Sequence, residues 1–170
     1  DPFLVQYTRF IKKAAQGDLG ISFIYQKPCT EVILKHAPAT LELVIGAGLI
    51  VILFSLPLGV FTALKPKNRF SKFVMGFSTL GVSIPVFLTA IMLIYLFAVI
   101  LGWLPSYGRG ETVDLFGNGY WQSGLFTADG LQHLILPSFS LASIMMPLFI
   151  RIIRSEMMEV LETEYIKYAW

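Results

Sequence analysis

The sequence predicts an all-α membrane protein, a polytopic helix bundle. Of its 170 residues, 55% are hydrophobic and only 14% are charged, whereas about 25% of the residues in soluble domains are charged. This small number of charged residues cannot cover a water-facing surface. Most apolar side chains are therefore expected to face lipid or one another. The charges also leave three long segments within residues 41–153 almost free of Lys, Arg, Asp and Glu. This composition excludes a soluble enzyme, a disordered tail and a nucleic-acid binder.

Residues 1–40 are predicted to form an amphipathic segment and loop on the outer side of the membrane. Apolar side chains recur at helical spacing over residues 2–16, and Gly17 ends the pattern. We expect this helix to lie on the membrane surface or on another part of the protein. The chain starts at Asp1 with no targeting signal, so we expect it to be cut from a longer protein. Its single cysteine, Cys29, forms no internal disulfide.

The first membrane span is predicted at residues 41–64. Residues 43–64 carry no charge, and at ~1.5 Å per residue they cross the ~30 Å hydrocarbon core. Pro38 and Thr40 are expected at the entrance of this helix, because a proline in the first turn and a hydroxyl cap are favourable there. Pro57 predicts a kink within the span.

The second span is predicted at residues 73–101 and is too long for one straight helix. A break is expected near residues 81–85, because Pro85 lacks an N–H group and Gly81 loosens the backbone. Residues 69–80 would then form an interfacial helix or the start of a long tilted one.

The third span is predicted at residues 131–153 and is interrupted by Pro137 and Pro147. The carbonyls that these prolines free need partners from neighbouring helices or water, so this helix is expected to be buried within protein. Residues 154–170 follow with an apolar face opposite a row of glutamates. This tail is either a surface helix under the bilayer or a docking helix. The glutamates would be repelled by an anionic leaflet, which favours a protein partner.

The basic residues predict the orientation. The short loop 65–72 has four of them and no acid, and Arg151, Arg154 and Lys167 follow the third span. By the positive-inside rule, this loop and the tail are expected to be cytoplasmic. The outer loop 102–130 is rich in glycine, with aromatic residues that suit an interfacial belt, and a loop of this length is either functional or flexible.

Few side chains are candidates for chemistry. Glu42 is either a functional ionisable group in the membrane or a carboxylate stabilised by a nearby helix start. Asp129 and His133 share a helix face, but two ligands do not make a metal site, and a capping Asp beside an interfacial His is expected. His36 is isolated and reads as an interfacial polar residue. With no phosphate-binding loop, zinc motif or activated nucleophile, the chain is predicted not to be an enzyme.

Five short segments resemble the permease subunits of binding-protein-dependent ABC importers, in the dipeptide, oligopeptide and nickel family. They are GDLGISF at 17–23, PATLEL at 38–43, GVSIPVF at 81–87, LGWLP at 101–105 and residues 151–168. Each is weak alone, but the five in order are specific. The resemblance implies a type I ABC importer permease fold in a bacterial or archaeal inner membrane, with this chain as the middle of the subunit.

The same resemblance implies the partners. It pairs this chain with a second permease subunit, two cytoplasmic ATP-binding subunits and an extracytoplasmic solute-binding protein, with membrane lipid around it and no nucleic acid. The resemblance also implies that the partner subunits use ATP and that this chain binds no cofactor. By the same resemblance, the substrate is expected to be a peptide or a related small solute, chosen largely by the binding protein.

Two groups of site residues follow from this likeness. The start of the family's cytoplasmic signature helix, which contacts the ATPase, matches Glu164, Tyr165, Ile166, Lys167, Tyr168 and Ala169. The predicted helix break would line the translocation path at Ser83, Pro85 and Phe87, since such a break is tolerated where it faces protein or a water-filled cavity. A packing kink is the alternative for the break. The alternative for the whole chain is a non-transporting scaffold whose tail recruits a soluble protein.

Overall fold

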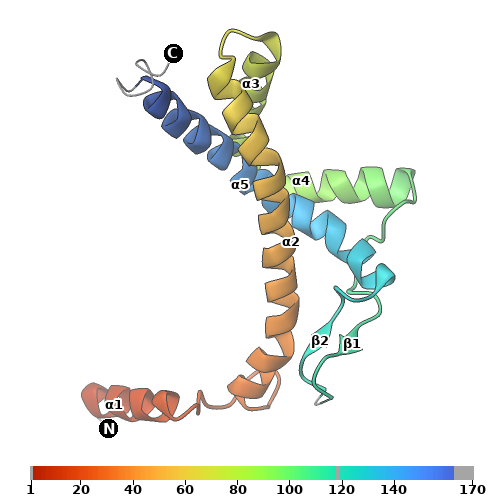
Figure 1. The fold of residues 1–170 in the computed structure, drawn as a ribbon. Coiled ribbons are helices and arrows are strands. Elements are labelled where there is room, and N and C mark those ends of the chain that lie inside the picture. Colours follow the sequence, from red (N-terminus) through yellow and green to blue (C-terminus); the bar gives the residue numbers. More distant parts are fainter. Residues whose placement is uncertain (1, 118, 163–170) are drawn as a thin grey trace.

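A computed structural model describes residues 2–117 and 119–162 as two long crossing helices with shorter elements around them (Figure 1). The predicted all-α membrane fold is confirmed, with one short hairpin added. The helices are α1 (Phe3–Ala15), α2 (Cys29–Leu64), α3 (Arg69–Ser83), α4 (Val86–Leu93), a π-helical continuation of α4 (Ile94–Ile100) and α5 (Ala128–Glu162). The hairpin pairs β1 (Val113–Asp114) with β2 (Gln122–Ser123) in antiparallel register.

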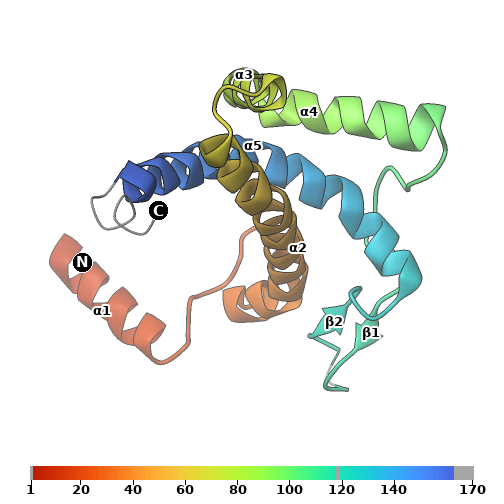
Figure 2. The same ribbon diagram turned by 45° about the horizontal axis from the view of Figure 1, so that its top comes forward.

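The helix α1 projects away from the rest of the chain in both views (Figures 1 and 2). None of its residues is buried. A compact connection follows, in which the Asp18 carboxylate accepts the Gly20 N–H at 2.9 Å and Ile21 pairs with Pro28. The amphipathic helix expected at residues 2–16 is therefore present, with its apolar face open.

The sequence suggested that the first long helix begins near Pro38, but α2 begins at Cys29. Pro28 is the N-terminal flanking residue, and Glu31 lies in the first turn, where a carboxylate is favourable. Pro38 and Pro57 both lie inside the helix. Thr40 is no cap, because its hydroxyl donates back to the His36 carbonyl at 3.4 Å.

The core of the bundle is the crossing of α2 and α5, where small residues allow the backbones to approach. Gly59 faces Ile153, and a Cβ atom built on Gly59 would lie only 2.7 Å from that side chain. Ala142 is completely buried, and the Ser55 hydroxyl donates to the Met146 carbonyl at 3.3 Å. Small residues with interhelical hydrogen bonds are the usual means of packing helices in a membrane.

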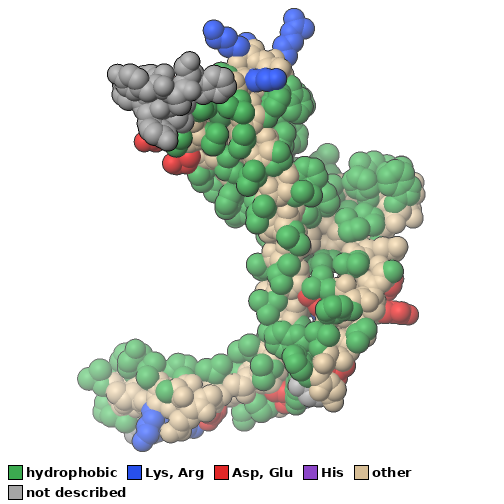
Figure 3. Space-filling view, viewed as in Figure 1, with side chains coloured by type: hydrophobic (Ala, Val, Ile, Leu, Met, Phe, Trp, Pro, Cys, Tyr) green, Lys and Arg blue, Asp and Glu red, His purple; other side chains and the backbone are tan. Residues whose placement is uncertain are grey.

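The turn between α2 and α3 is short and held by hydrogen bonds. The Asn68 side chain accepts the Phe70 N–H at 2.8 Å, and the buried Ser71 hydroxyl donates to the Lys65 carbonyl at 2.7 Å. Basic side chains crowd this end of the molecule (Figure 3). The end of α5 lies at the same end, and the hairpin lies at the opposite one (Figure 1). The predicted orientation requires this arrangement.

The helical structure is interrupted between α3 and α4, at Ile84 and Pro85. The segments Arg69–Gly81 and Val86–Ile100 are bent by 110° at the break. Within the described residues, α2 and α5 are each long and apolar enough to cross a membrane, and the bent pair adds a third crossing if it forms one span.

The helix α5 continues without interruption through both of its prolines and past residue 153 to Glu162. Residues 151–162 contain no glycine or proline that would end it. The predicted boundary between the third span and the tail is therefore not a break in the helix. The helix packs against α2, α3 and α4 along its length (Figure 2).

Candidate functional site

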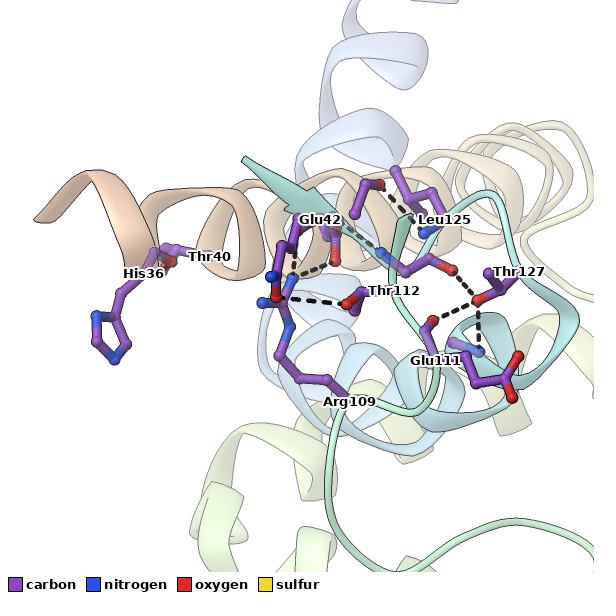
Figure 4. A network of polar contacts seen from close by, with 12 residues as sticks. His36, Thr40, Glu42, Arg109, Glu111, Thr112, Leu125 and Thr127 are labelled. Atoms are coloured by element: carbon purple, nitrogen blue, oxygen red, sulfur yellow. Dashed lines mark hydrogen bonds and ion pairs between the residues drawn. The ribbon is translucent and has the colours of Figure 1, made fainter. Parts of the chain in front are cut away.

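A buried carboxylate joins α2 to the outer loop. Glu42 is 7% exposed. Its Oε2 accepts a hydrogen bond from Arg109 Nη2 at 3.1 Å, and its Oε1 accepts the Gly124 N–H at 3.0 Å. Arg109 Nη2 also donates to the Gln122 carbonyl at 3.0 Å (Figure 4). We call these four residues the Glu42 clasp.

The clasp explains why a charged side chain is tolerated in a buried position. A buried carboxylate is costly unless it is paired and hydrogen-bonded, and here one oxygen takes the guanidinium and the other a backbone amide. The sequence suggested that the start of a helix stabilises Glu42, and this explanation is wrong. The helix begins at Cys29, more than three turns earlier.

A second set of hydrogen bonds attaches the same loop to the start of α5. Thr127 is the cap of this helix: its Oγ1 accepts the Gly130 N–H at 3.0 Å and donates to the Glu111 carbonyl at 2.6 Å. Asp129 Oδ2 accepts the Glu111 N–H at 2.7 Å. The role expected for Asp129 as the capping residue therefore belongs to Thr127, and Asp129 holds the loop instead.

His133 lies between this network and two cavities. Its Nδ1 is 2.8 Å from the Asp129 carbonyl and 3.6 Å from Asp129 Oδ1. One cavity, of about 160 Å³, also borders Glu42 and Arg109. The other, of about 420 Å³, lies between α2, α4 and α5. Among the described residues, no group of three or more His, Cys, Asp and Glu side chains is arranged to hold a metal ion.

His36 lies apart from the clasp and points away from it (Figure 4). Its Nδ1 is 2.8 Å from the Val32 carbonyl, and its ring lies 6.0 Å from that of Tyr25. The residue therefore makes local contacts on an exposed part of α2.

The residues predicted to line a path lie at the break between α3 and α4, and all three are exposed. The Ser83 hydroxyl reaches back to the Thr79 carbonyl at 3.5 Å. Pro85 directly precedes α4, and Phe87 is 64% exposed. A cavity of about 250 Å³ borders the same break, and its polar lining comes from other residues, namely Ser78, Thr89 and Ser143.

The break lies at the middle depth of the first predicted span. Gly81 packs on the Pro147 ring, since a Cβ atom there would be 3.1 Å from Pro147 Cγ. The neighbouring Met146 carbonyl accepts from Ser55, which is near the centre of the uncharged run 43–64. The hydrogen bond from Ser55 thus places the break between α3 and α4 beside the proline-containing part of α5, level with the middle of the uncharged run 43–64.

The six residues predicted to contact an ATPase, Glu164 to Ala169, lie outside the described residues. The described part of α5 ends at Glu162, two positions before them.

Sequence reasoning missed the partners of Glu42. Arg109 is 67 positions away in the sequence, and Gly124 contributes only a backbone N–H, so no local pattern connects them. The Thr127 cap had a readable signal, because a threonine stands directly before a helical pattern with Asp129 in its first turn.

Comparisons with known proteins agree on one family. Residues 55–169 match the model of the binding-protein-dependent transport system inner membrane component. The chain is 38% identical to the dipeptide transport system permease protein DppB of Alkalihalophilus pseudofirmus, over 98% of this chain and 53% of that protein. It is 34% identical to the oligopeptide transport system permease protein AppB of Bacillus subtilis, over 99% and 51%. It is 33% identical to the oligopeptide transport system permease protein OppB of Salmonella typhimurium, over 99% and 50%.

The chain thus spans about half the length of these relatives. The family description and the apolar helices α2 and α5 place it in an inner membrane, which it crosses more than once. The predicted resemblance is confirmed by a match that includes the α3–α4 break and the whole of α5, and the chain belongs to the family of binding-protein-dependent transport system inner membrane components.

Proposed function

We propose that this chain is part of the membrane-spanning permease subunit of an ATP-driven importer of peptides or related small solutes. The observation that carries the proposal is the family match over residues 55–169, together with relatives named as dipeptide and oligopeptide permeases. The same match favours the permease over the scaffold, because it covers the end of α2, all of α3, α4 and α5, and the tail.

The α3–α4 break is proposed to border the translocation path. Irregular backbone at membrane depth is tolerated where it meets protein or a water-filled cavity, and transporters place solute sites near the midplane at interrupted helices. The contact of Gly81 with Pro147 shows that the break meets protein, and the adjacent cavity offers the second kind of environment. Both observations support a place for the break beside the path. Ser83, Pro85 and Phe87 are exposed in this chain and are available to a path completed by further helices.

Energy for transport is proposed to come from separate ATP-binding subunits that contact Glu164 to Ala169. A second permease subunit and an extracytoplasmic solute-binding protein complete the proposed assembly. The continuous α5 supports this arrangement, because one helix leads from the crossing with α2 to Glu162, two positions before the proposed contact in the sequence. The basic α2–α3 turn is proposed to be cytoplasmic, since it lies at the same end of the molecule as the end of α5 (Figure 1).

Uptake by the full-length subunit, reconstituted with its partners in proteoliposomes, tests the function. We expect ATP-dependent accumulation of a labelled dipeptide by the unmodified complex. The double variant Glu164→Lys with Tyr165→Ala should hydrolyse ATP without uptake, because the proposed contact is lost while the spans remain intact.

The matched control is Glu159→Lys, which reverses an exposed charge on α5, before the proposed contact in the sequence. It should transport normally. No accumulation by the unmodified complex would refute the import function. Normal uptake by the double variant would refute only the coupling role of the tail.

A further inference from the structure

We propose that residues 105–108 form a lid over an apolar cavity at the outer end of the bundle, and that the Glu42–Arg109 ion pair holds this lid closed. The inference rests on the proposed function in one respect, because it assigns the lid to the control of access to the transport path from the outer side. The closed position itself is described by contacts within this chain.

The cavity beneath the lid has a volume of about 420 Å³, which is within the range of small-ligand pockets, about 300–1,000 Å³. Its inner walls come from α2, α4, the π-helical segment and α5, and they are largely apolar. Pro105, Ser106, Tyr107 and Gly108 form the remaining wall. Lifting this short segment would therefore open the cavity, while the helices that form the other walls stay in place.

Arg109 follows the lid directly and ties it to α2. Its guanidinium bridges the Glu42 carboxylate and the Gln122 carbonyl, so one side chain connects the lid, the helix and the hairpin. The pair joins residues 67 positions apart. By contrast, the pairs Lys13–Asp18 and Lys27–Glu31 join close neighbours and hold no distant segment in place.

The exposure of the two partners suits a reversible contact. The Arg109 side chain is 38% exposed and the Glu42 side chain 10%. A guanidinium that is already partly hydrated loses little on release, and Glu42 regains water when the loop that covers it moves away. The pair thus favours the closed position without making it permanent.

Glycines in the left-handed region flank the lid. Gly102 has φ +62° and has no atom near the position of a Cβ, whereas Gly110 has φ +66° and packs closely against Asp129 and His133. Residues other than glycine rarely adopt this conformation. The first glycine provides a free pivot, and the second keeps the far end anchored on α5.

Thiol labelling measures the lid directly. The full-length subunit carries Cys29→Ser and a reporter, Ala90→Cys, on the α4 wall of the cavity, and a membrane-impermeant maleimide is added from the outer side. We expect slow labelling in this parent. Glu42→Gln and Arg109→Gln should each raise the labelling rate about tenfold or more, because a hydrogen-bonded ion pair at a buried carboxylate is lost. Arg109→Lys, which keeps the charge, should fall between these variants and the parent.

Glu31→Gln is the matched control, since it removes the partner of Lys27 from the first turn of α2, the helix that also carries Glu42. Its labelling rate should equal that of the parent. As a measurement without a reporter, hydrogen exchange of the Gly124 amide, which donates to Glu42, should accelerate in Glu42→Gln and Arg109→Gln.

Parent-like labelling and exchange in both clasp variants would refute the lid, as would equal acceleration in Glu31→Gln. Neither readout requires uptake. Failure of the proposed import function would therefore appear in the proteoliposome assay and not in these measurements.

Discussion

The crossing of α2 and α5 predicts that Gly59→Ala destabilises the protein although alanine favours helices. A Cβ atom at Gly59 would lie 2.7 Å from Ile153 Cβ and Cγ2, and 3.3 Å from the Ile150 carbonyl oxygen. Both contacts are with atoms at or near the backbone of α5, so they are relieved only if the helices move apart. Gly48 lies on the same helix with nothing within 4 Å of such an atom and provides the matched control.

The magnitude follows from two opposing terms. Replacing a helical glycine by alanine stabilises a helix by about 1 kcal/mol, and this gain applies at both positions. Overpacking a close contact costs about 1–3 kcal/mol, and this cost applies at Gly59 alone. The free energy of unfolding of Gly59→Ala should therefore be about 1–3 kcal/mol below that of Gly48→Ala.

Gly46→Ala should fall between these two variants. A Cβ atom there would lie 2.6 Å from Ser138 Oγ, which is buried without a hydrogen-bond partner among the described residues. That hydroxyl can rotate away about a single torsion angle, so the relaxation costs less than moving a backbone.

Unfolding of the purified full-length subunit in mixed micelles, driven by increasing SDS and followed by circular dichroism, gives the three free energies. The expected order of stability is Gly48→Ala, then Gly46→Ala, then Gly59→Ala. Equal stability of Gly48→Ala and Gly59→Ala would show that α2 and α5 do not approach closely at Gly59, and the described crossing would be wrong there.

Two further predictions concern the break between α3 and α4. Ser83→Ala and Phe87→Ala should change the rate or selectivity of peptide uptake several-fold at normal expression, and unchanged transport in both would remove their proposed path role. Gly81→Ala should slow uptake several-fold, because its methyl group presses on the Pro147 ring 3.1 Å away. Gly76→Ala on the same helix meets no atom and should transport normally, so equal rates in the two glycine variants would contradict the importance of this contact.

Much of the secondary structure could be read from local patterns. The amphipathic helix near the start, the uncharged run of α2 and the break before Pro85 all follow from residue spacing and from the missing N–H of proline. The start of α2 was misplaced because Pro38 looked like a first-turn proline, whereas the helix already begins at Cys29, directly after Pro28.

The candidate site was predictable only in part. The break that holds Ser83 and Pro85 was visible in the sequence, but its depth depends on the hydrogen bond from Ser55 to Met146, which joins two helices. The burial of Glu42 also depends on Arg109, from a distant loop. Neither contact produces a local pattern in the sequence.

Composition and spacing alone therefore determined that this chain is a membrane protein, where its apolar segments lie and where one helix must break, because hydrophobicity and backbone geometry act on near neighbours. Only the tertiary structure decided that α5 continues past the expected membrane exit, that α2 and α5 cross at Gly59, and that Glu42 holds the outer loop. These features depend on which distant surfaces fit together, and that fit is set by packing and hydrogen bonding across the folded chain.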